Sequence, residues 1–263
     1  SVSGKTQTIS REVSCMSGKY MAYVGSYSYT GKAKGITVFD VDVENGMFKE
    51  RCEIEVDNSS YVIASSDGKT LYSIADEGVV SFRILPNGSL ARLNSAPIRG
   101  MRGCHLCTDE EDKYVFVSGY HDGKTTVLSL NPDGSVGKIV DGVFDRGYGS
   151  VAERNFRPHV TCTRRMPDNR FVLSVDNGID QVKIYRFNDK EQKLVQVDAI
   201  RCDLESAPRH FRYSKDGKFI YLMYELKKAI EVYTYKTGDR APVIEKIQTI
   251  STTSTKKPDN LTA

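Results

Sequence analysis

Short runs in which apolar and polar residues alternate fill this chain, and each run follows a turn that carries Lys or Arg. Alternation with a period of two is typical of a strand that buries one face and exposes the other. Five such segments occur, at residues 17–24, 67–74, 112–117, 168–175 and 216–223. A second run rich in β-branched and aromatic residues follows each of them, and no stretch has helical periodicity. The pattern therefore predicts an all-β protein.

The five segments recur at a nearly constant interval. Their basic residues, called anchors below, stand at positions 19, 69, 113, 170 and 218, with steps of 50, 44, 57 and 48 residues. A repeat of about 40–50 residues built from short strands is typical of a β-propeller, in which each repeat forms one blade of four antiparallel strands. We therefore expect one propeller domain over residues 16–263, with about five blades in this chain.

The two ends of the chain bear on how the propeller closes. Residues 5–10 read KTQTIS and residues 246–251 read KIQTIS, which places both segments at the outer strand of a blade. We expect residues 1–15 to be an N-terminal extension whose residues 5–14 close the ring; a chance likeness or a disordered leader is the alternative. The next anchor would fall beyond Ala263, so we expect a propeller truncated after its fifth repeat, although five blades that close on themselves would also fit.

Composition argues against several classes of function. The chain has 37 basic and 34 acidic residues, interspersed along its length, which does not favour a nucleic-acid surface. No run is long and apolar enough to span a bilayer, so no membrane partner is expected. Cys104 and Cys107 have CxxC spacing, but a zinc site needs further ligands and a redox motif favours a helix N-terminus. We expect reduced thiols in a cytoplasmic protein, with no metal and no cofactor.

Candidate chemistry gathers just upstream of the anchors, where each blade begins and the channel of a propeller lies. His105, His210 and Tyr61 each stand eight residues before their anchor, and His159 stands eleven before. Three of the four histidines thus occupy related places in different blades. His121 is expected to be only a turn residue.

Two charged residues join these histidines. Arg209 lies at a blade entry, and Glu225 follows the second strand of the same blade. An imidazole can move protons near neutral pH, a guanidinium can hold an oxyanion, and a carboxylate can act as a base. We expect His105, His159 and Arg209 to face a common pocket; the alternative is that each bonds the backbone of the neighbouring blade.

Several motifs resemble the lactonase family of seven-bladed propellers, which includes 6-phosphogluconolactonases and 3-carboxy-cis,cis-muconate lactonizing enzymes. Residues 208–210 (PRH), 216–218 (DGK) and 225–226 (EL) resemble that family's G-P-R-H…P-D-G-K…N-E-L pattern. Residues 176–182 resemble its D-L-G-x-D-R-V turn. The similarity runs from about residue 20 to the end, and it implies that about two blades lie outside this chain.

The resemblance implies roles for individual residues. Carried over by position, the catalytic residues are His159, Arg209 and Glu225. The residues implied to bind substrate are His105, His210, Thr161 and Tyr120. A further family arginine would lie beyond Ala263. This sequence also departs from the family pattern: Thr161 replaces a second histidine, and Gly119, Asn177 and Tyr224 replace Asn, Leu and Asn.

These residues predict metal-independent hydrolysis of a sugar lactone, most specifically of 6-phosphogluconolactone. A neutral sugar-acid lactone is an alternative, because only one arginine is evident for a phosphate. Another alternative is a cycloisomerase, which forms a lactone by adding a carboxylate to an alkene. A propeller that binds a small ligand or a partner without catalysis, or an inactive fragment, also remains open.

Overall fold

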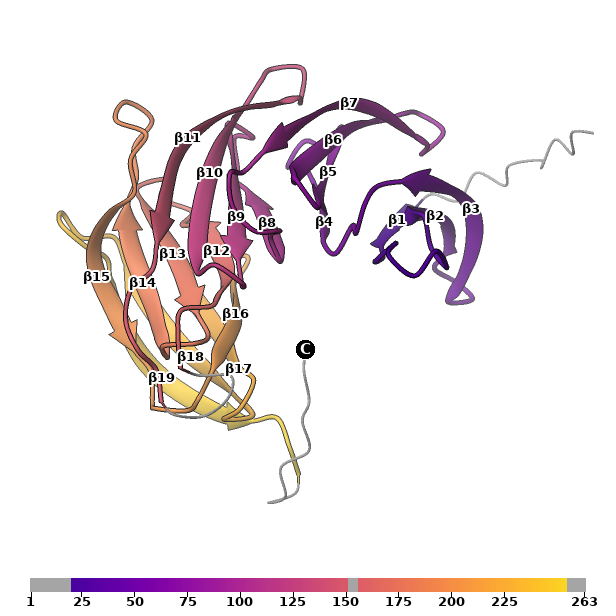
Figure 1. Cartoon of the computed structure of the whole chain (residues 1–263). Helices are drawn as coiled ribbons and strands as arrows, with labels where there is room; N and C mark the ends of the chain where they lie inside the picture. The colour runs from indigo at the N-terminus through magenta and orange to yellow at the C-terminus, as the bar shows by residue number, and fades with distance from the viewer. Residues whose placement is uncertain (1–19, 151–155, 255–263) are drawn as a thin grey trace, which may run out of the picture.

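The structure, a computed structural model, describes residues 20–150 and 156–254, and its ordered elements in these ranges are all strands. Five antiparallel sheets follow one another along an arc, from indigo at β1 to yellow at β19 (Figure 1). The prediction of an all-β propeller is therefore confirmed. No described residue belongs to a helix that could cross a membrane.

Each sheet is one blade, numbered here 1 to 5. Blade 1 consists of β1 (Tyr20–Gly25), β2 (Gly35–Asp42) and β3 (Met47–Glu55), and blade 2 consists of β4 (Val62–Ala64), β5 (Thr70–Ala75), β6 (Gly78–Ile84) and β7 (Leu90–Pro97). Blade 3 consists of β8 (His105–Thr108), β9 (Tyr114–Gly119), β10 (Lys124–Leu130) and β11 (Val136–Phe144). Blade 4 consists of β12 (Val160–Arg165), β13 (Phe171–Asp176), β14 (Gln181–Arg186) and β15 (Val195–Arg201), and blade 5 consists of β16 (Pro208–Tyr213), β17 (Phe219–Tyr224), β18 (Ala229–Lys236) and β19 (Val243–Ser251).

The anchor turns have a simple chemical basis. In three blades an aspartate two residues before the anchor accepts the anchor's backbone N–H, from Lys69 at 2.9 Å, Arg170 at 2.9 Å and Lys218 at 3.2 Å. Such Asx turns offer the backbone a local partner and reverse the chain. Each turn leads from the first strand of its blade to the second, so the recurrent anchors of the sequence mark equivalent points of the fold.

A second feature repeats in every blade. The pairing between its last two strands shifts register, at 38/39, 81/82, 127/128, 184/185 and 232/233, and blade 3 has a second shift at 128/130. A bulge at this place bends and twists the outer strand. Residues 246–251 lie on β19, the outer strand of blade 5, as the sequence pattern predicts. The proposed closing strand at residues 5–14 lies outside the described residues.

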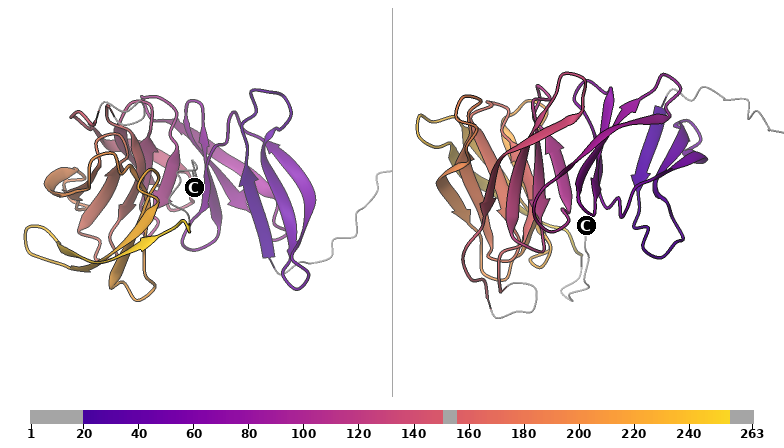
Figure 2. Two further views of the ribbon diagram at one scale, coloured as in Figure 1. Left: turned by 90° about the horizontal axis from the view of Figure 1, so that it is seen from below. Right: turned by 45° about the horizontal axis from the view of Figure 1, so that its top comes forward.

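The hydrophobic core lies between blades. Four clusters of buried side chains each join one blade to the next: blades 1 and 2 around Ile36 and Phe82, blades 2 and 3 around Ile74 and Val117, blades 3 and 4 around Phe116 and Phe187, and blades 4 and 5 around Leu173 and Leu222. The two further views in Figure 2 show the sheets stacked in this order. Blade packing in series brings the first strands of successive blades together on the inner side of the arc.

Candidate functional site

A pocket of about 570 Å³ opens at the inner side of the arc, and all five blades contribute to it. Four of its residues hold one repeated position, nine residues before an anchor: Ser60, Cys104, Thr161 and Arg209. The others are Tyr27, Tyr61, Tyr120, His121, His210 and Glu225. The fold therefore brings together residues up to about 200 positions apart in the chain, which is the arrangement expected of a propeller ligand site.

The charged centre of the pocket is an ion pair within blade 5. Nη1 of Arg209 donates to Oε2 of Glu225 at 2.8 Å, and their side chains are 28% and 8% exposed. Nδ2 of Asn177, from the β13–β14 turn, also donates to that carboxylate oxygen at 3.3 Å. The buried Nε of Arg209 has no hydrogen-bond partner among the described residues. Arg209 thus holds the carboxylate while part of its side chain remains exposed.

Arg209 is placed by a backbone irregularity. The pairing of β16 with β17 shifts between Pro208 and His210, so Arg209 is the extra residue of a bulge, and Thr161 is the extra residue at the same place in β12. Bulges re-aim side chains next to functional sites. Oγ1 of Thr161 donates to the carbonyl oxygen of Arg209 at 2.7 Å and so ties the two bulges together. Thr161 therefore supports the arginine as well as lining the pocket.

His159 lies behind the pocket wall rather than in it. Its ring stacks on that of Tyr120 with centroids 4.2 Å apart, and its Nδ1 lies 2.6 Å from the carbonyl oxygen of Tyr120. The side chain is buried, and burial lowers the pKa of the imidazole although the hydrogen bond to Tyr120 raises it. The ring therefore donates from Nδ1 and is neutral. Tyr120 lines the pocket. Its binding of substrate and the catalytic role of His159 stay predictions.

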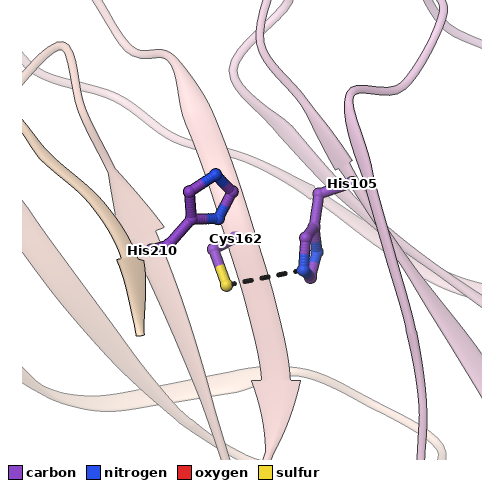
Figure 3. Close-up of side chains that lie close together, drawn as sticks. All are labelled: His105, Cys162 and His210. Atoms are coloured by element: carbon purple, nitrogen blue, oxygen red, sulfur yellow. Dashed lines mark hydrogen bonds between the residues drawn. The ribbon is translucent and has the colours of Figure 1, made fainter. Parts of the chain in front are cut away.

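His105 and His210 come together with a residue that the sequence reasoning did not select. Cys162 stands eight residues before its anchor, as the two histidines do, and the three side chains converge (Figure 3). The rings of His105 and His210 are 5.8 Å apart, and Sγ of Cys162 lies 3.6 Å from Nε2 of His105. His210 lines the pocket, whereas His105 is fully buried. The eight-residue offset would have identified Cys162 if it had been applied to every residue type.

This cluster has the donor atoms of a metal site, all within 4.8 Å of one another, but its surroundings do not suit a cation. Nη2 of Arg164 lies 3.2 Å from Nε2 of His105 and donates to the lone pair that a metal would need. Burial and then the positive charge of Arg164 hold the pKa of His105 well below its usual value. Burial, with Arg209, Arg164 and Arg212, lowers the pKa of His210 to about 4. Both rings are therefore neutral near pH 7, and the positive charges of the nearby arginines disfavour a bound cation.

Comparison with known proteins agrees with this geometry. Residues 21–263 match the family described as lactonase, 7-bladed β-propeller. A 6-phosphogluconolactonase of Bacillus subtilis is 31% identical over 239 residues, which cover 89% of this chain and 67% of that protein. A 6-phosphogluconolactonase of Formosa agariphila is 27% identical over 82% of this chain and 65% of its own length.

The solved structures give the same picture. A crystal structure of a Bacteroides fragilis protein, assigned provisionally as a 6-phosphogluconolactonase, superposes with a TM-score of 0.79 at 31% identity, over 88% of this chain and 67% of that one. The chain therefore spans about two thirds of the length of these relatives. It belongs to the lactonase family of seven-bladed β-propellers.

Proposed function

We propose that this protein hydrolyses a sugar lactone, with 6-phosphogluconolactone as the favoured substrate. The observation that carries the proposal is the ion pair of Arg209 with Glu225 in a pocket to which all five blades contribute. Membership of the lactonase family and two relatives named 6-phosphogluconolactonase support it. The predicted cytoplasmic location is part of the proposal, and the five free cysteines of the described residues support it.

The arrangement suits attack by water on an ester carbonyl. Glu225 would accept a proton from water as the oxygen bonds to the carbonyl carbon. Arg209, whose side chain lines the pocket and is 28% exposed, would stabilise the oxyanion, which is commonly the dominant contribution in acyl transfer. The carbonyl carbon–ring oxygen bond then breaks, and the ring oxygen takes the proton from Glu225, so that lactone and water become one hydroxy acid. No step requires a metal ion.

Glu225 is better placed than His159 to act as the base. The carboxylate lines the pocket, whereas Nδ1 of His159 is engaged by the carbonyl of Tyr120 and the ring lies behind that residue. A general base contributes about 10²–10⁴-fold to rate, and an oxyanion donor about 10²–10³-fold. His159 would then act by holding Tyr120 in the pocket wall.

The test is a lactonase assay on purified protein, with freshly generated 6-phosphogluconolactone and with glucono-δ-lactone, corrected for spontaneous hydrolysis. We expect Glu225→Gln and Arg209→Gln to lower kcat by about 100-fold or more. Glu245→Gln on β19 and Arg186→Gln on β14 change exposed residues of the same types and serve as controls. Wild-type protein without activity above the spontaneous rate would contradict the proposal and favour a ligand-binding propeller, and full activity in Glu225→Gln would remove that residue from the mechanism.

A further inference from the structure

A second pocket, of about 370 Å³, lies beside the first one in the channel. Tyr61 and His210 line both pockets, so the two adjoin, and the second one extends over Tyr221, Met223 and Ile230 of β17 and β18. Arg164 and Arg212 line only the second pocket. Neither arginine belongs to the predicted site, and neither is needed for the hydrolytic step proposed above.

The two arginines occupy equivalent places in the repeat. Each stands six residues before its anchor, two residues further along its strand than Cys162 or His210. Side chains two residues apart on a strand share a face. Arg164 and Arg212 therefore form the next level of the channel beyond the cluster shown in Figure 3.

Their charges are not neutralised within the described part of the chain. Arg164 donates to Sγ of Cys107 and to Nε2 of His105, each at 3.2 Å, and both partners are neutral. Its Nε is buried without a hydrogen-bond partner. Among residues 20–150 and 156–254, no carboxylate lies within ion-pair distance of Arg164 or Arg212.

The groups that act on His210 show the same imbalance. Three arginines (209, 164 and 212) face it, against one carboxylate, Glu225, which is already paired with Arg209. Arg164 is half-buried, and a buried guanidinium without a counter-charge is costly unless a ligand supplies one. This excess of positive charge selects an anion for the channel and disfavours a metal ion on the neighbouring imidazoles and thiol.

We propose that Arg164 and Arg212 form a phosphate-binding site in the channel, next to the Arg209–Glu225 pair. Paired guanidinium groups match the oxygens of a phosphate in geometry and in charge. As the physiological ligand, the site would take the 6-phosphate of the substrate, and this part rests on the proposed function. In such a lactone the phosphate is carried on C6, across the ring oxygen from the ester carbonyl. We therefore expect one molecule to extend from the first pocket to the second past Tyr61 and His210. Inorganic phosphate is the other source of the same group.

Binding of inorganic phosphate tests the site independently of catalysis. Titration calorimetry on wild-type protein should give a measurable Kd that is weakened at least tenfold in Arg212→Gln and in Arg164→Gln. Arg212 is exposed, so its replacement tests the site even if the replacement of half-buried Arg164 disturbs the fold. Arg186→Gln is the matched control and should bind as wild type does.

Kinetics identify the source of the phosphate. We expect the ratio of kcat/KM for 6-phosphogluconolactone to that for glucono-δ-lactone to fall at least tenfold in Arg212→Gln, mainly through KM, and to be kept in Arg186→Gln. If phosphate binding depends on the two arginines but the ratio of kcat/KM values is unchanged, the site is supported and its ligand is free phosphate. If both arginine variants bind phosphate as wild type does and keep the ratio, the proposal is wrong. If no lactone is hydrolysed at all, the proposed function fails while the calorimetry still decides the site.

Discussion

Ala207 has a backbone conformation that side chains rarely adopt, and it stands immediately before Pro208 and Arg209. Its φ is 49°, in the left-handed region, where a Cβ costs about 1–2 kcal/mol. Asp180 holds this conformation: its carboxylate accepts the N–H of Ala207 at 2.8 Å, and the carbonyl oxygen of Ala207 in turn accepts the N–H of Glu225. The backbone on both sides of the Arg209–Glu225 pair thus depends on one strained residue. The lactonase pattern G-P-R-H has glycine at this position.

We expect Ala207→Gly to raise the free energy of unfolding by about 1 kcal/mol, because glycine removes the Cβ clash at a positive φ. Ala207→Val should lower it, since a β-branched side chain is worse in this conformation. Urea denaturation of the two variants and the parent measures both changes. A decrease in stability on Ala207→Gly would show that the residue is not strained.

At the scale of single strands, the end of β13 depends on a carboxyl group that is protonated at neutral pH. Oδ1 of Asp176 accepts the N–H groups of His159, Gly178 and Ile179. Oδ2 of Asp176 and Oδ2 of Asp145 are both buried without a protein donor. Burial, and next the hydrogen bond with Asp145, raise the pKa of Asp176 to about 8.

This pKa predicts how stability depends on pH. The folded state keeps a proton on Asp176 that the unfolded state loses near pH 4, so its contribution is fully present below about pH 4 and is lost as pH rises to about 8. Asp176→Asn can keep the three accepted bonds and donate to Asp145, so it should flatten this decline and be more stable than the parent at pH 8. Denaturation at pH 5, 6.5 and 8 measures the effect, with exposed Asp57→Asn as control. Parallel pH profiles for the parent and Asp176→Asn would contradict the assignment.

The strands and turns also show how much of the structure could be predicted from the sequence. Alternation and the Asp-x-basic turns were sufficient for the strands and blades, since both act within a few residues. The offset before each anchor indicated Arg209 and His210, which line one pocket with Glu225 and with Tyr120, a residue implied by the family resemblance. His105, expected in the same pocket as Arg209, is buried and does not line it. The pattern could not show that His159 lies behind Tyr120, because that depends on a stacking contact between blades. Arg164 and Arg212 were missed because what distinguishes them is that no described carboxylate lies near them. The packing of neighbouring blades determines this, and the sequence pattern does not show it.

At the scale of the whole molecule, stability is shared between neighbouring blades. Each hydrophobic cluster joins one blade to the next, and the strand contacts between sheets also join consecutive blades. Such arrays behave nearly as a sum of units and of the interfaces between neighbours. A defect in one interface should therefore weaken the two blades beside it most.

Phe116 tests this expectation between blades 3 and 4. Its ring is fully buried and packs edge-on against the ring of Phe187, with the ring centroids 5.8 Å apart. Phe116→Ala should therefore lower the free energy of unfolding by about 3–5 kcal/mol. Hydrogen exchange followed by mass spectrometry should show the largest loss of protection in β8–β15 and a smaller one in β1–β3. Val243→Ala, at an exposed position of β19, is the control. Equal loss of protection in all five blades would mean that the array unfolds as a single unit.

Because the blades are arranged in series, some residues of the pocket lie in different blades and others lie in the same blade. Tyr27 in blade 1 and Arg209 in blade 5 face the same space, yet four interfaces separate them, so small rotations at those interfaces add up between the two residues. Arg209 and Glu225 belong to one blade, and their separation is independent of that sum. We therefore expect the width of the opening to depend on how the blades pack against one another, whereas the separation of Arg209 and Glu225 is set within blade 5. Substitutions at the interfaces between blades should therefore change which molecules fit the pocket more than they change the Arg209–Glu225 pair.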